Sequence, residues 1–504
     1  TSKFDLTFSY IHTASERLTL HLEYATDLFT SDWISTFTKR FKYIVSSLLQ
    51  DPGQTVGQAP TALPEEVKRI KEEVNNTVRS FPRDKSVYTL FTEMVDEHPD
   101  ATALQTAEES WTYRELNNVV DIKATIMHNE VDLNPGDNVA LLLPKSAEFV
   151  IALLAVLKNG CSYLPLDAGS PKDRLALMLD DCNTKSIITD SNLIDRLPES
   201  TSANVINVDE RKWKNEDVAE IIATQEVDGE ATACIIYTSG STGKPKGVEL
   251  VQRNIARIVF TPNYMTVGPG KGMLLLASIS FDAAMLEIFG PLLNGGTLAI
   301  PTVERMLDVL VLEDNLARFN VTQMFMTTSL FNIFAQQNPG VFGFVEELLV
   351  GGERLTPEYM HQVRQACPKT RVYNGYGPTE NSTISTFHPI RDEDQDDIPI
   401  GRPITNSTAW IANRFGGLQP PGIPGELMLG GEGVMKGYVN REELTERALV
   451  RYPFADEILY HSGDHAVLDD DYLIRFIGRK DNQVKVRGHR IEIGEVESAL
   501  EMHP

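Results

Sequence analysis

Cysteine, long apolar runs and positive charge are all scarce in this sequence. Its 504 residues include only four cysteines, Cys161, Cys182, Cys234 and Cys367, which lie far apart and form neither a CxxC pair nor a zinc-binding spacing. A disulfide scaffold is therefore excluded, and a reducing, cytoplasmic setting is expected. No apolar run approaches the roughly 20 residues that a membrane helix needs. The opening residues, TSKFDLTFSY, lack the pattern of a secretory signal and an initiator Met, so we expect a piece of a longer protein.

The charge balance is strongly acidic. Lysine and arginine number 46 against 71 aspartates and glutamates, which gives a formal net charge of −25. This charge repels phosphate backbones and anionic lipid, so binding to nucleic acid or to a membrane is disfavoured as a main role. With 42% hydrophobic and 23% charged residues, the composition is that of a globular protein with sizeable cores. The length predicts several structural units.

Two segments precede the main body of the chain. Residues 4–24 alternate in polarity as two short strands would, and residues 32–50 place apolar side chains at helical spacing. A Gly- and Pro-bearing, then charged, stretch follows. We predict that residues 1–50 are the tail of a preceding domain and that residues 51–80 are a linker. The alternative is that the early strands join the main core.

The main body alternates between strand-like and helix-like patterns. NVALLLP at 138–144 precedes the helical EFVIALLAVLKNG at 148–160, and ACIIYTS at 233–239 is a further buried-type strand. This alternation favours an α/β fold with largely parallel sheets. After Gly401 the pattern changes to Gly- and Pro-rich β segments, which predicts a smaller β-rich subdomain. An acidic run, RDEDQDD at 391–397, is read as an exposed loop.

The segment YTSGSTGKPKG at 237–247 carries the clearest chemistry. It follows a buried-type strand and combines three glycines, four hydroxyl residues and two lysines. Glycines let several backbone N–H groups turn toward one anion, and the hydroxyl groups add further donors. Such a loop suits the phosphates of a nucleotide. It is not a Walker A loop, because Lys244 is followed by Pro245. The alternative is an ordinary flexible turn.

This loop resembles the phosphate-loop signature of adenylate-forming enzymes. Further segments resemble adenylation domains of nonribosomal peptide synthetases, in the same order: WTYRELN at 111–117, LKNGCSYLPLD at 157–167, SISFDAAMLEIFGPLLNGGTL at 278–298, NGYGPTE at 374–380, GELMLGGEGVMKGYVNREELT at 425–445, HSGD at 461–464 and GRKDNQVKVRGHRIEIGEVE at 478–497. SKFDLTF at 2–8 resembles the end of a condensation domain. The resemblance implies the adenylate-forming fold, with a large N-terminal subdomain (81–478) of two α/β sheets plus a β-rich subdomain. The hinge and the start of a small α+β C-terminal subdomain would follow at 479–504.

By this resemblance, the chain binds ATP and Mg²⁺. Glu380 is the expected metal ligand, since a carboxylate is a hard oxygen donor. Thr379, Glu380 and Lys244 are the expected catalytic residues. The nucleotide would be bound by Thr238, Ser239, Gly240, Ser241, Thr242, Gly243, Lys244, Gly352, Asn374, Tyr376, Thr379, Asp464 and Arg479.

Within that set, the resemblance gives individual roles. Tyr376 offers a face for adenine, Asn374 reads its amino edge, and Asp464 accepts from the ribose hydroxyls. Asp481 is the implied hinge between the two subdomains. Alternative readings are an ordinary turn for HSGD and a surface ion pair for Arg479 and Asp481.

Asp282 decides the substrate class. It stands where amino-acid-activating members of the family carry the carboxylate that binds the substrate ammonium, and a cation in a dry pocket needs a paired anion. The alternative is a helix N-cap. The other implied pocket residues are Ala283, Leu286, Phe325, Leu349, Gly351, Gly375, Thr383 and Ile384. Small and apolar walls predict a large, neutral side chain, and an acylated N-hydroxyornithine of the fungal siderophore class is one candidate.

The implied activity is ATP-dependent activation of an amino acid as aminoacyl-AMP. The acyl group would then pass to the phosphopantetheine thiol of a downstream carrier domain, with a condensation domain upstream. The family's catalytic lysine belongs to a segment beyond ALEMHP, so none is assigned. Two other readings stay open: an acyl- or aryl-CoA ligase, and a nucleotide-binding remnant without turnover.

Overall fold

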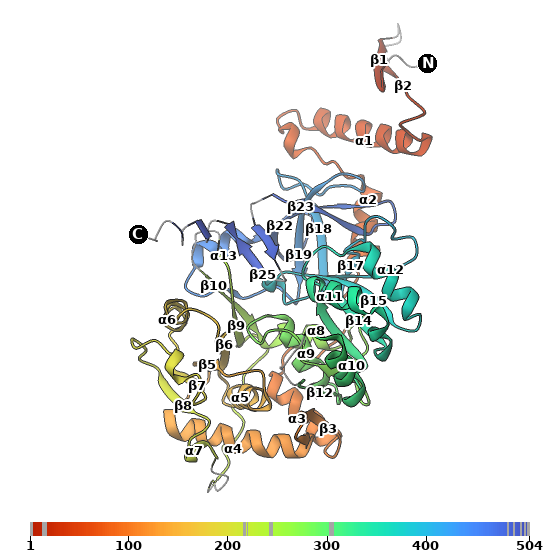
Figure 1. Ribbon diagram of the computed structural model, residues 1–504. Coiled ribbons are helices and arrows are strands. Elements are labelled where there is room, and N and C mark those ends of the chain that lie inside the picture. Colours follow the sequence, from red (N-terminus) through yellow and green to blue (C-terminus); the bar gives the residue numbers. More distant parts are fainter. Residues whose placement is uncertain are drawn as a thin grey trace.

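The computed structural model describes residues 4–12, 18–214, 218, 220–240, 245–301, 307–480, 483–486, 489–493, 496–497 and 500. Within them, two large sheets and one smaller sheet make up the body of the molecule (Figure 1). None of the described helices combines the length and the apolar composition needed to cross a bilayer.

The first large sheet has seven strands, and five neighbouring ones, from β9 to β8, are parallel. Their order across the sheet is β20 (Gly437–Tyr438), β10 (Lys246–Val251), β9 (Thr232–Thr238), β6 (Ser162–Pro165), β5 (Asn138–Leu142), β7 (Ser186–Thr189) and β8 (Asn204–Asn207). Successive residues of β5 point to opposite faces: Val139 and Leu141 join the central core, whereas Ala140 and Leu142 pack under α6 (Lys172–Asp181). Both faces are therefore covered, as the apolar sequence of this strand predicts.

The second large sheet has nine strands. Their order is β17 (Arg402–Pro403), β16 (Thr386–Pro389), β15 (Arg371–Tyr376), β14 (Glu347–Gly351), β13 (Gln323–Thr327), β11 (Gly272–Leu274), β12 (Thr297–Ala299), β3 (Thr102–Gln105) and β4 (Ser110–Thr112). The strands from β15 to β3 are parallel. One face packs on α10 (Val309–Arg318), α11 (Thr328–Gln337) and α12 (Pro357–Ala366), and the other faces the central core.

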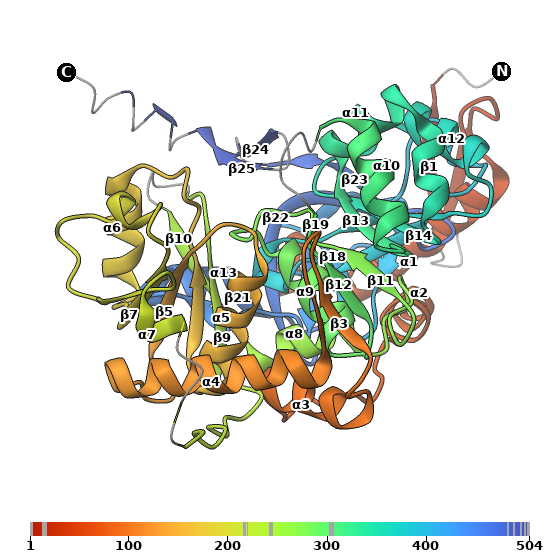
Figure 2. The same ribbon diagram turned by 60° about the horizontal axis from the view of Figure 1, so that its bottom comes forward.

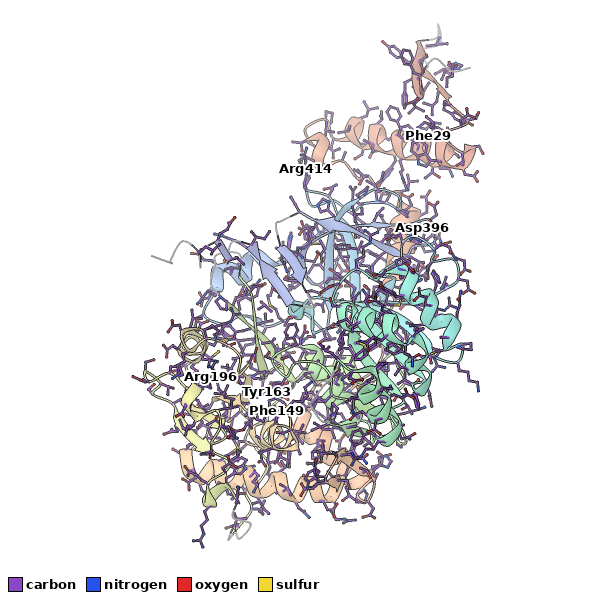
Figure 3. The ribbon with its side chains drawn as sticks, in the orientation of Figure 1. Phe29, Phe149, Tyr163, Arg196, Asp396 and Arg414 are labelled. Atoms are coloured by element: carbon purple, nitrogen blue, oxygen red, sulfur yellow. The ribbon has the colours of Figure 1, made fainter. Side chains whose placement is uncertain are left out.

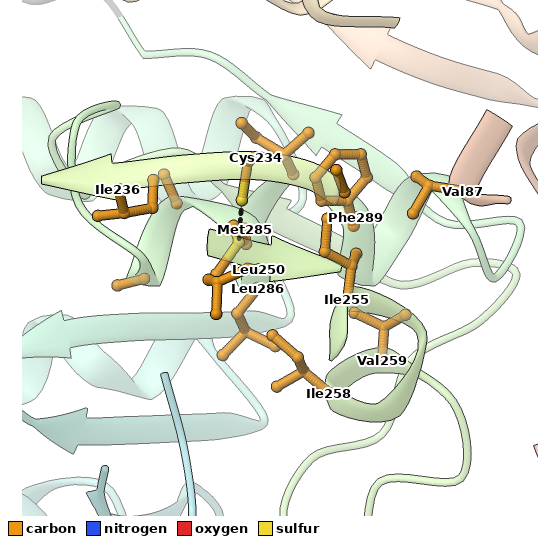
Figure 4. Close-up of a cluster of buried hydrophobic side chains, with 14 of the residues drawn as sticks. Val87, Cys234, Ile236, Leu250, Ile255, Ile258, Val259, Met285, Leu286 and Phe289 are labelled. Atoms are coloured by element: carbon orange, nitrogen blue, oxygen red, sulfur yellow. Dashed lines mark hydrogen bonds between the residues drawn. The ribbon is translucent and has the colours of Figure 1, made fainter. Parts of the chain in front are cut away.

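Helices fill the space between the two large sheets. α5 (Ala147–Lys158) is apolar on nearly all sides and buried along its length, as expected for a helix enclosed by other elements. It packs against α3 (Val87–Glu97) and α4 (Tyr113–Val131), and Figure 2 shows the three helices side by side. Phe149 of α5 and Tyr163 of β6, both labelled in Figure 3, are buried in the same core. α8 (Gln252–Val259) and α9 (Ala283–Leu292) meet in the same core, where Cys234 and Met285 are in contact (Figure 4).

A five-stranded β-rich sheet completes the body of the molecule. It consists of β18 (Ser407–Ala412), β19 (Gly425–Gly431), β22 (Ile458–Leu468), β21 (Leu449–Arg451) and β23 (Ile474–Arg479). α13 (Glu442–Ala448) leads directly into β21, and the hairpin β24 (Gln483–Val486) and β25 (His489–Glu492) follows the sheet. The change of pattern after Gly401 is therefore confirmed as a β-rich unit.

The N-terminal segments contact this β-rich unit. β1 (Leu6–His12), β2 (Leu18–Tyr24) and α1 (Ser31–Gln50) lie at one end of the molecule, where Figure 3 labels Phe29 above Arg414. The segment predicted as a linker holds α2 (Pro64–Arg69), which continues as a wider turn over Ile70–Val74. Asn75 and the backbone of Ala409 exchange hydrogen bonds of 3.1 and 2.7 Å. This part is packed structure, and the predicted domain boundaries stay a prediction.

Candidate functional site

A cleft of about 350 Å³ opens where β14 and β15 end against the β-rich sheet. Parallel strands bring their carboxyl ends to one edge, which is where such folds bind ligands. The cleft is lined by residues that the sequence assigned to the nucleotide, together with one assigned to the acyl pocket: Gly352, Asn374, Gly375, Tyr376, Asp464 and Arg479. Segments more than 100 residues apart in the sequence thus meet around one cavity.

Three of these side chains form a connected polar group. The Tyr376 hydroxyl donates to Oδ2 of Asp464 at 2.5 Å, and Arg479 donates to Oδ1 at 2.6 Å. β22 and β23 place Asp464 directly opposite Arg479. Burial and the neighbouring Asp464 carboxylate raise the pKa of Tyr376 well above its ordinary value, so its hydroxyl remains a donor. The group holds a carboxylate and an aromatic face in fixed positions at the edge of the cleft.

Asn374 is oriented by the backbone. Its Nδ2 donates to the carbonyl oxygen of Pro399 at 2.8 Å, which turns Oδ1 away from that carbonyl. An amide oxygen accepts from an exocyclic amino group. Gly352, beside it in the cleft, has a φ of +94°, and a side chain there would be strained.

Glu380 lies fully buried just beyond the cleft. Its Oε1 accepts from Lys246 at 3.0 Å and from the Tyr438 hydroxyl at 2.8 Å, and the ammonium also lies 4.2 Å from the centre of the Tyr438 ring. The sequence motifs predict Glu380 as a site residue, but they do not predict its partners Lys246 and Tyr438. For Lys246 the available signal was its place as the second lysine of KPKG, but the catalytic role was predicted for the first lysine, Lys244.

The phosphate-loop segment joins two antiparallel strands. Thr238 closes β9 and lies opposite Lys246, which opens β10. Thr238 is buried, and its Oγ1 has no hydrogen-bond partner among the described residues, a feature that suits an anionic ligand at this end of the strands. Ser239 and Gly240 are buried beside it. Four predicted residues, Ser241, Thr242, Gly243 and Lys244, lie outside the described residues, as does the predicted hinge Asp481.

Asp282 precedes α9 at the N-cap position, but its side chain accepts no capping hydrogen bond. The structure therefore disfavours the capping role as the reason for this residue. The Thr383 hydroxyl donates to the backbone oxygen of Asp282 at 3.0 Å, which joins two predicted pocket residues. Ala283 and Leu286 follow on α9 and are buried.

The predicted acyl wall lies on one face of the nine-stranded sheet. Phe325 and Leu349 are opposite each other in β13 and β14. A Cβ added to Gly375 would lie 2.9 Å from Cδ1 of Leu349 and 3.2 Å from Cδ1 of Ile384, so these three residues enclose one space. Gly351 has another reason to be glycine: a Cβ there would lie 2.3 Å from the carbonyl oxygen of Gly375. Strand packing, and not pocket volume, explains its size.

Two ionisable side chains, Lys145 and Glu287, hold the loop that leads to Asp282. Lys145 donates to the carbonyl oxygen of Leu276 at 2.5 Å, and Glu287 accepts from the N–H of Ala277 at 2.9 Å. Both atoms belong to one peptide unit, so the Lys145 ammonium and the Glu287 carboxyl group hold it from two sides. Burial raises the pKa of Glu287 to about 8, although the Lys145 ammonium lowers it.

For a metal, Glu380 is the group that fits. The described residues contain no cluster of three or more His, Cys, Asp and Glu side chains with metal-binding spacing. Mg²⁺ bound to a nucleotide needs only one or two protein carboxylates, because phosphate oxygens and water supply the other ligands. One buried carboxylate between the cleft and the phosphate-loop strands meets that requirement.

Residues 91–439 match a family model described as AMP-binding enzyme. The chain belongs to this family. Gramicidin S synthase 2 of Brevibacillus brevis is 38% identical over 504 residues, which cover 100% of this chain and 11% of that protein. The chain thus spans only a small part of the length of this curated relative.

Solved structures of peptide synthetases have the same fold. FmoA3, a nonribosomal peptide synthetase, has a TM-score of 0.84 at 27% identity over 94% of this chain and 51% of its own. PA1221, described as containing adenylation and PCP domains, has a TM-score of 0.78 at 28% identity over 84% of this chain and 73% of its own. The predicted α/β fold of the adenylate-forming type is confirmed, as is the resemblance to synthetase adenylation domains. The condensation-domain tail and the siderophore class stay predictions.

Proposed function

We propose that this AMP-binding enzyme is an amino-acid-activating adenylation domain of a nonribosomal peptide synthetase. A carboxylate oxygen of the amino acid attacks the α-phosphorus of ATP, the bond to the β-phosphate oxygen breaks, and pyrophosphate leaves. The product is an aminoacyl adenylate. A phosphopantetheine thiol on a carrier domain then displaces AMP, and an upstream condensation domain uses the loaded acyl group.

One observation carries this proposal: Gly375 belongs to both parts of the site. It lines the nucleotide cleft with Tyr376 and Asp464, and its Cα faces Leu349 and Ile384 of the acyl wall. The α-phosphate and the substrate carboxylate would therefore meet beside it. Proximity of this kind, together with fixed charges, supplies much of the rate enhancement.

Different charged groups would serve the phosphates and the substrate ammonium at this centre. Lys246 and Glu380 lie where the phosphates would extend from the cleft toward β9 and β10. Mg²⁺ on Glu380 would neutralise charge that develops on the leaving pyrophosphate. On the acyl side, Asp282 would bind the substrate ammonium, and the Thr383 hydroxyl fixes its backbone by donating to its carbonyl oxygen.

The acyl wall supports a neutral side chain. Leu286, Phe325, Leu349 and Ile384 are apolar and buried, so a cationic side chain would lack a partner there. Leu349 and Ile384 already fill the space beside Gly375, and this glycine therefore gives no argument for a long side chain. The acylated N-hydroxyornithine is one member of the panel to be tested.

Pyrophosphate exchange tests this function. The chain is assayed with amino acids and with the matching carboxylic acids that lack the amino group, and amino acids alone should support saturable exchange. Asp282→Ala should raise KM for the amino acid at least about 30-fold, since truncating one partner of a desolvated charge pair costs about 2–5 kcal/mol. KM for ATP should change little. Equal exchange with the des-amino acids would indicate a CoA-ligase type of substrate.

Asp308→Ala is the matched control. Asp308 occupies the N-cap of α10, a helix as long as α9, and its side chain does accept a capping bond from Leu310 at 3.0 Å. This variant should lose about 1 kcal/mol of stability and retain the KM for the amino acid. The same result for Asp282→Ala would mean that Asp282 serves only the helix.

A further inference from the structure

Arg257, on α8, is a charged side chain buried to 1% exposure. Its Nη1 donates to the carbonyl oxygens of Ser382 at 3.2 Å and Ile384 at 2.7 Å, and its Nη2 contacts Oδ1 of Asn381 and the hydroxyl of Ser407. All four acceptors are uncharged. A guanidinium is costly to bury, and three of its four acceptors here belong to one short segment, residues 381–384.

That segment has a strained backbone. Ser382 and Thr383 are consecutive non-glycine residues with φ of +54° and +67°, in the left-handed region. A β-branched residue such as Thr383 is rarely found there, because its side chain crowds the backbone. Strain of this kind persists only when surrounding contacts impose it, and it gathers at functional sites.

The contacts that impose it come from both sides of the turn. The Ser382 hydroxyl donates to the carbonyl oxygen of Gly433 at 2.7 Å. Gly433 has no room for a side chain, because a Cβ there would lie 2.7 Å from the Arg257 guanidinium. Arg257 donates to the carbonyl oxygens of the residues on either side of Thr383. The Thr383 hydroxyl in turn donates to the backbone oxygen of Asp282.

The turn also joins the two halves of the site. Glu380, which serves the nucleotide side, lies two residues before Ser382 in the sequence, and Ile384 of the acyl wall follows Thr383. We propose that Arg257 is a positioning residue that holds the Ser382–Thr383 turn and thereby fixes Asp282 and the acyl wall relative to Glu380. The proposal rests on the function proposed above, and adds a residue that touches neither substrate.

Arg257→Lys tests it. Lysine keeps the charge but cannot reach both carbonyls and Ser407 at once, so the turn can relax. We expect kcat/KM for the amino acid in pyrophosphate exchange to fall at least about tenfold, since a displacement of about 1 Å can cost about 10²-fold. The dissociation constant for ATP alone, measured by calorimetry, should change less than about threefold. If Arg257 had only a structural role, the variant would lose stability without this difference between kcat/KM for the amino acid and the dissociation constant for ATP.

Arg253→Lys is the matched control. Arg253 lies one turn earlier on α8, where it pairs with Glu230 at 2.9 Å and donates to the carbonyl oxygen of Glu432 at 2.7 Å. Its kinetics should match those of wild type. An Arg257→Lys enzyme with wild-type kcat/KM would overturn this inference alone, whereas absence of exchange with every acid by wild type would overturn the proposed function and this inference with it.

If Arg257→Lys does not fold, Thr383→Gly tests the same inference. Glycine adopts a positive φ without strain, so the turn is free to shift, and KM for the amino acid should rise at least about tenfold. Thr383→Ser, which keeps the hydroxyl, should retain most of the wild-type activity. Thr261→Gly is the control, since Thr261 is an exposed threonine with φ of +51° outside the site. A wild-type KM in Thr383→Gly would contradict the proposal.

Discussion

Lys246 and Glu380 form an ion pair of 3.0 Å in which the carboxylate is fully buried and the ammonium nearly so. The two residues are 134 positions apart, one at the start of β10 and the other after β15, so the pair ties the two large sheets together at the nucleotide site. Tyr438 bonds to both charged groups at 2.8 Å. The pair, together with Tyr438, gives the Glu380 carboxylate a fixed position.

Lys246→Met should therefore damage both stability and activity. Removing the lysine takes a cation away from the buried Glu380 carboxylate, and breaking a buried pair in this way costs about 3–5 kcal/mol of unfolding free energy. Pyrophosphate exchange should fall by about 10² or more, as for other preorganised groups at a charged transition state. Urea unfolding and exchange kinetics measure the two effects. Tyr438→Phe should show the smaller loss of a single hydrogen bond.

Lys436→Met is the control for this variant. Lys436 lies two residues before Tyr438 and pairs with Glu249 at 3.2 Å, but its side chain is half exposed. Exposed pairs contribute little, so its stability should change by less than about 1 kcal/mol. Equal losses for Lys246→Met and Lys436→Met would show that the buried pair has no special role.

Much of the cleft could be predicted from the sequence, because ordered motifs assign residues such as Tyr376, Asp464 and Arg479 without any knowledge of packing. The lysine that pairs with Glu380 could not be predicted from the sequence. Both lysines of KPKG suit an anion, and the folded chain shows that Lys246, opposite Thr238 at the start of β10, reaches Glu380. Arg257 was missed for a related reason, since a charged residue in a helix is expected at the surface.

Burial in the segment 51–80 could not be predicted from the local sequence either. Its apolar residues Ile70 and Val74 stand among charged neighbours, a pattern typical of a linker. In the structure both are buried, and Arg69 lies over the ring of Tyr472 at 4.1 Å. Tertiary contacts with a sheet more than 300 residues later decide this burial, and no local pattern reports them.

Tyr376→Phe should weaken nucleotide binding while it keeps the aromatic face. The variant removes the hydroxyl that donates to Asp464 at 2.5 Å, and a hydrogen bond to a charged group contributes about 1.5–3 kcal/mol. The dissociation constant for ATP should rise about tenfold or more by calorimetry. Tyr373→Phe, in the same strand but half-buried, is the control. An unchanged constant in Tyr376→Phe would mean that Asp464 needs no support from this hydroxyl.

Gly375→Ala should affect the acyl side more than the nucleotide side. The new Cβ would lie 2.9 Å from Cδ1 of Leu349, so the leucine side chain must move into the acyl space. KM for a large amino acid should rise, and Gly375→Trp should abolish its activation. Adding Leu349→Val to Gly375→Ala removes the obstructing atom and should restore activity in part. Unchanged selectivity in Gly375→Trp would show that Gly375 does not line the acyl pocket.

Glu287→Gln should change how stability depends on pH. Burial raises the pKa of Glu287 to about 8 in the folded chain, whereas an unfolded glutamate titrates near about 4.3. Between these values the folded state holds a proton that the unfolded state has lost, so the free energy of unfolding falls as pH rises toward 8. Glutamine cannot titrate but can still accept from Ala277. Urea unfolding between pH 5 and 8 should therefore show the variant gaining stability relative to wild type as pH rises. Glu108→Gln, at an exposed position, should show no such trend. A constant difference between Glu287→Gln and wild type across this range would contradict the raised pKa, and would mean that Lys145 keeps the carboxylate ionised throughout.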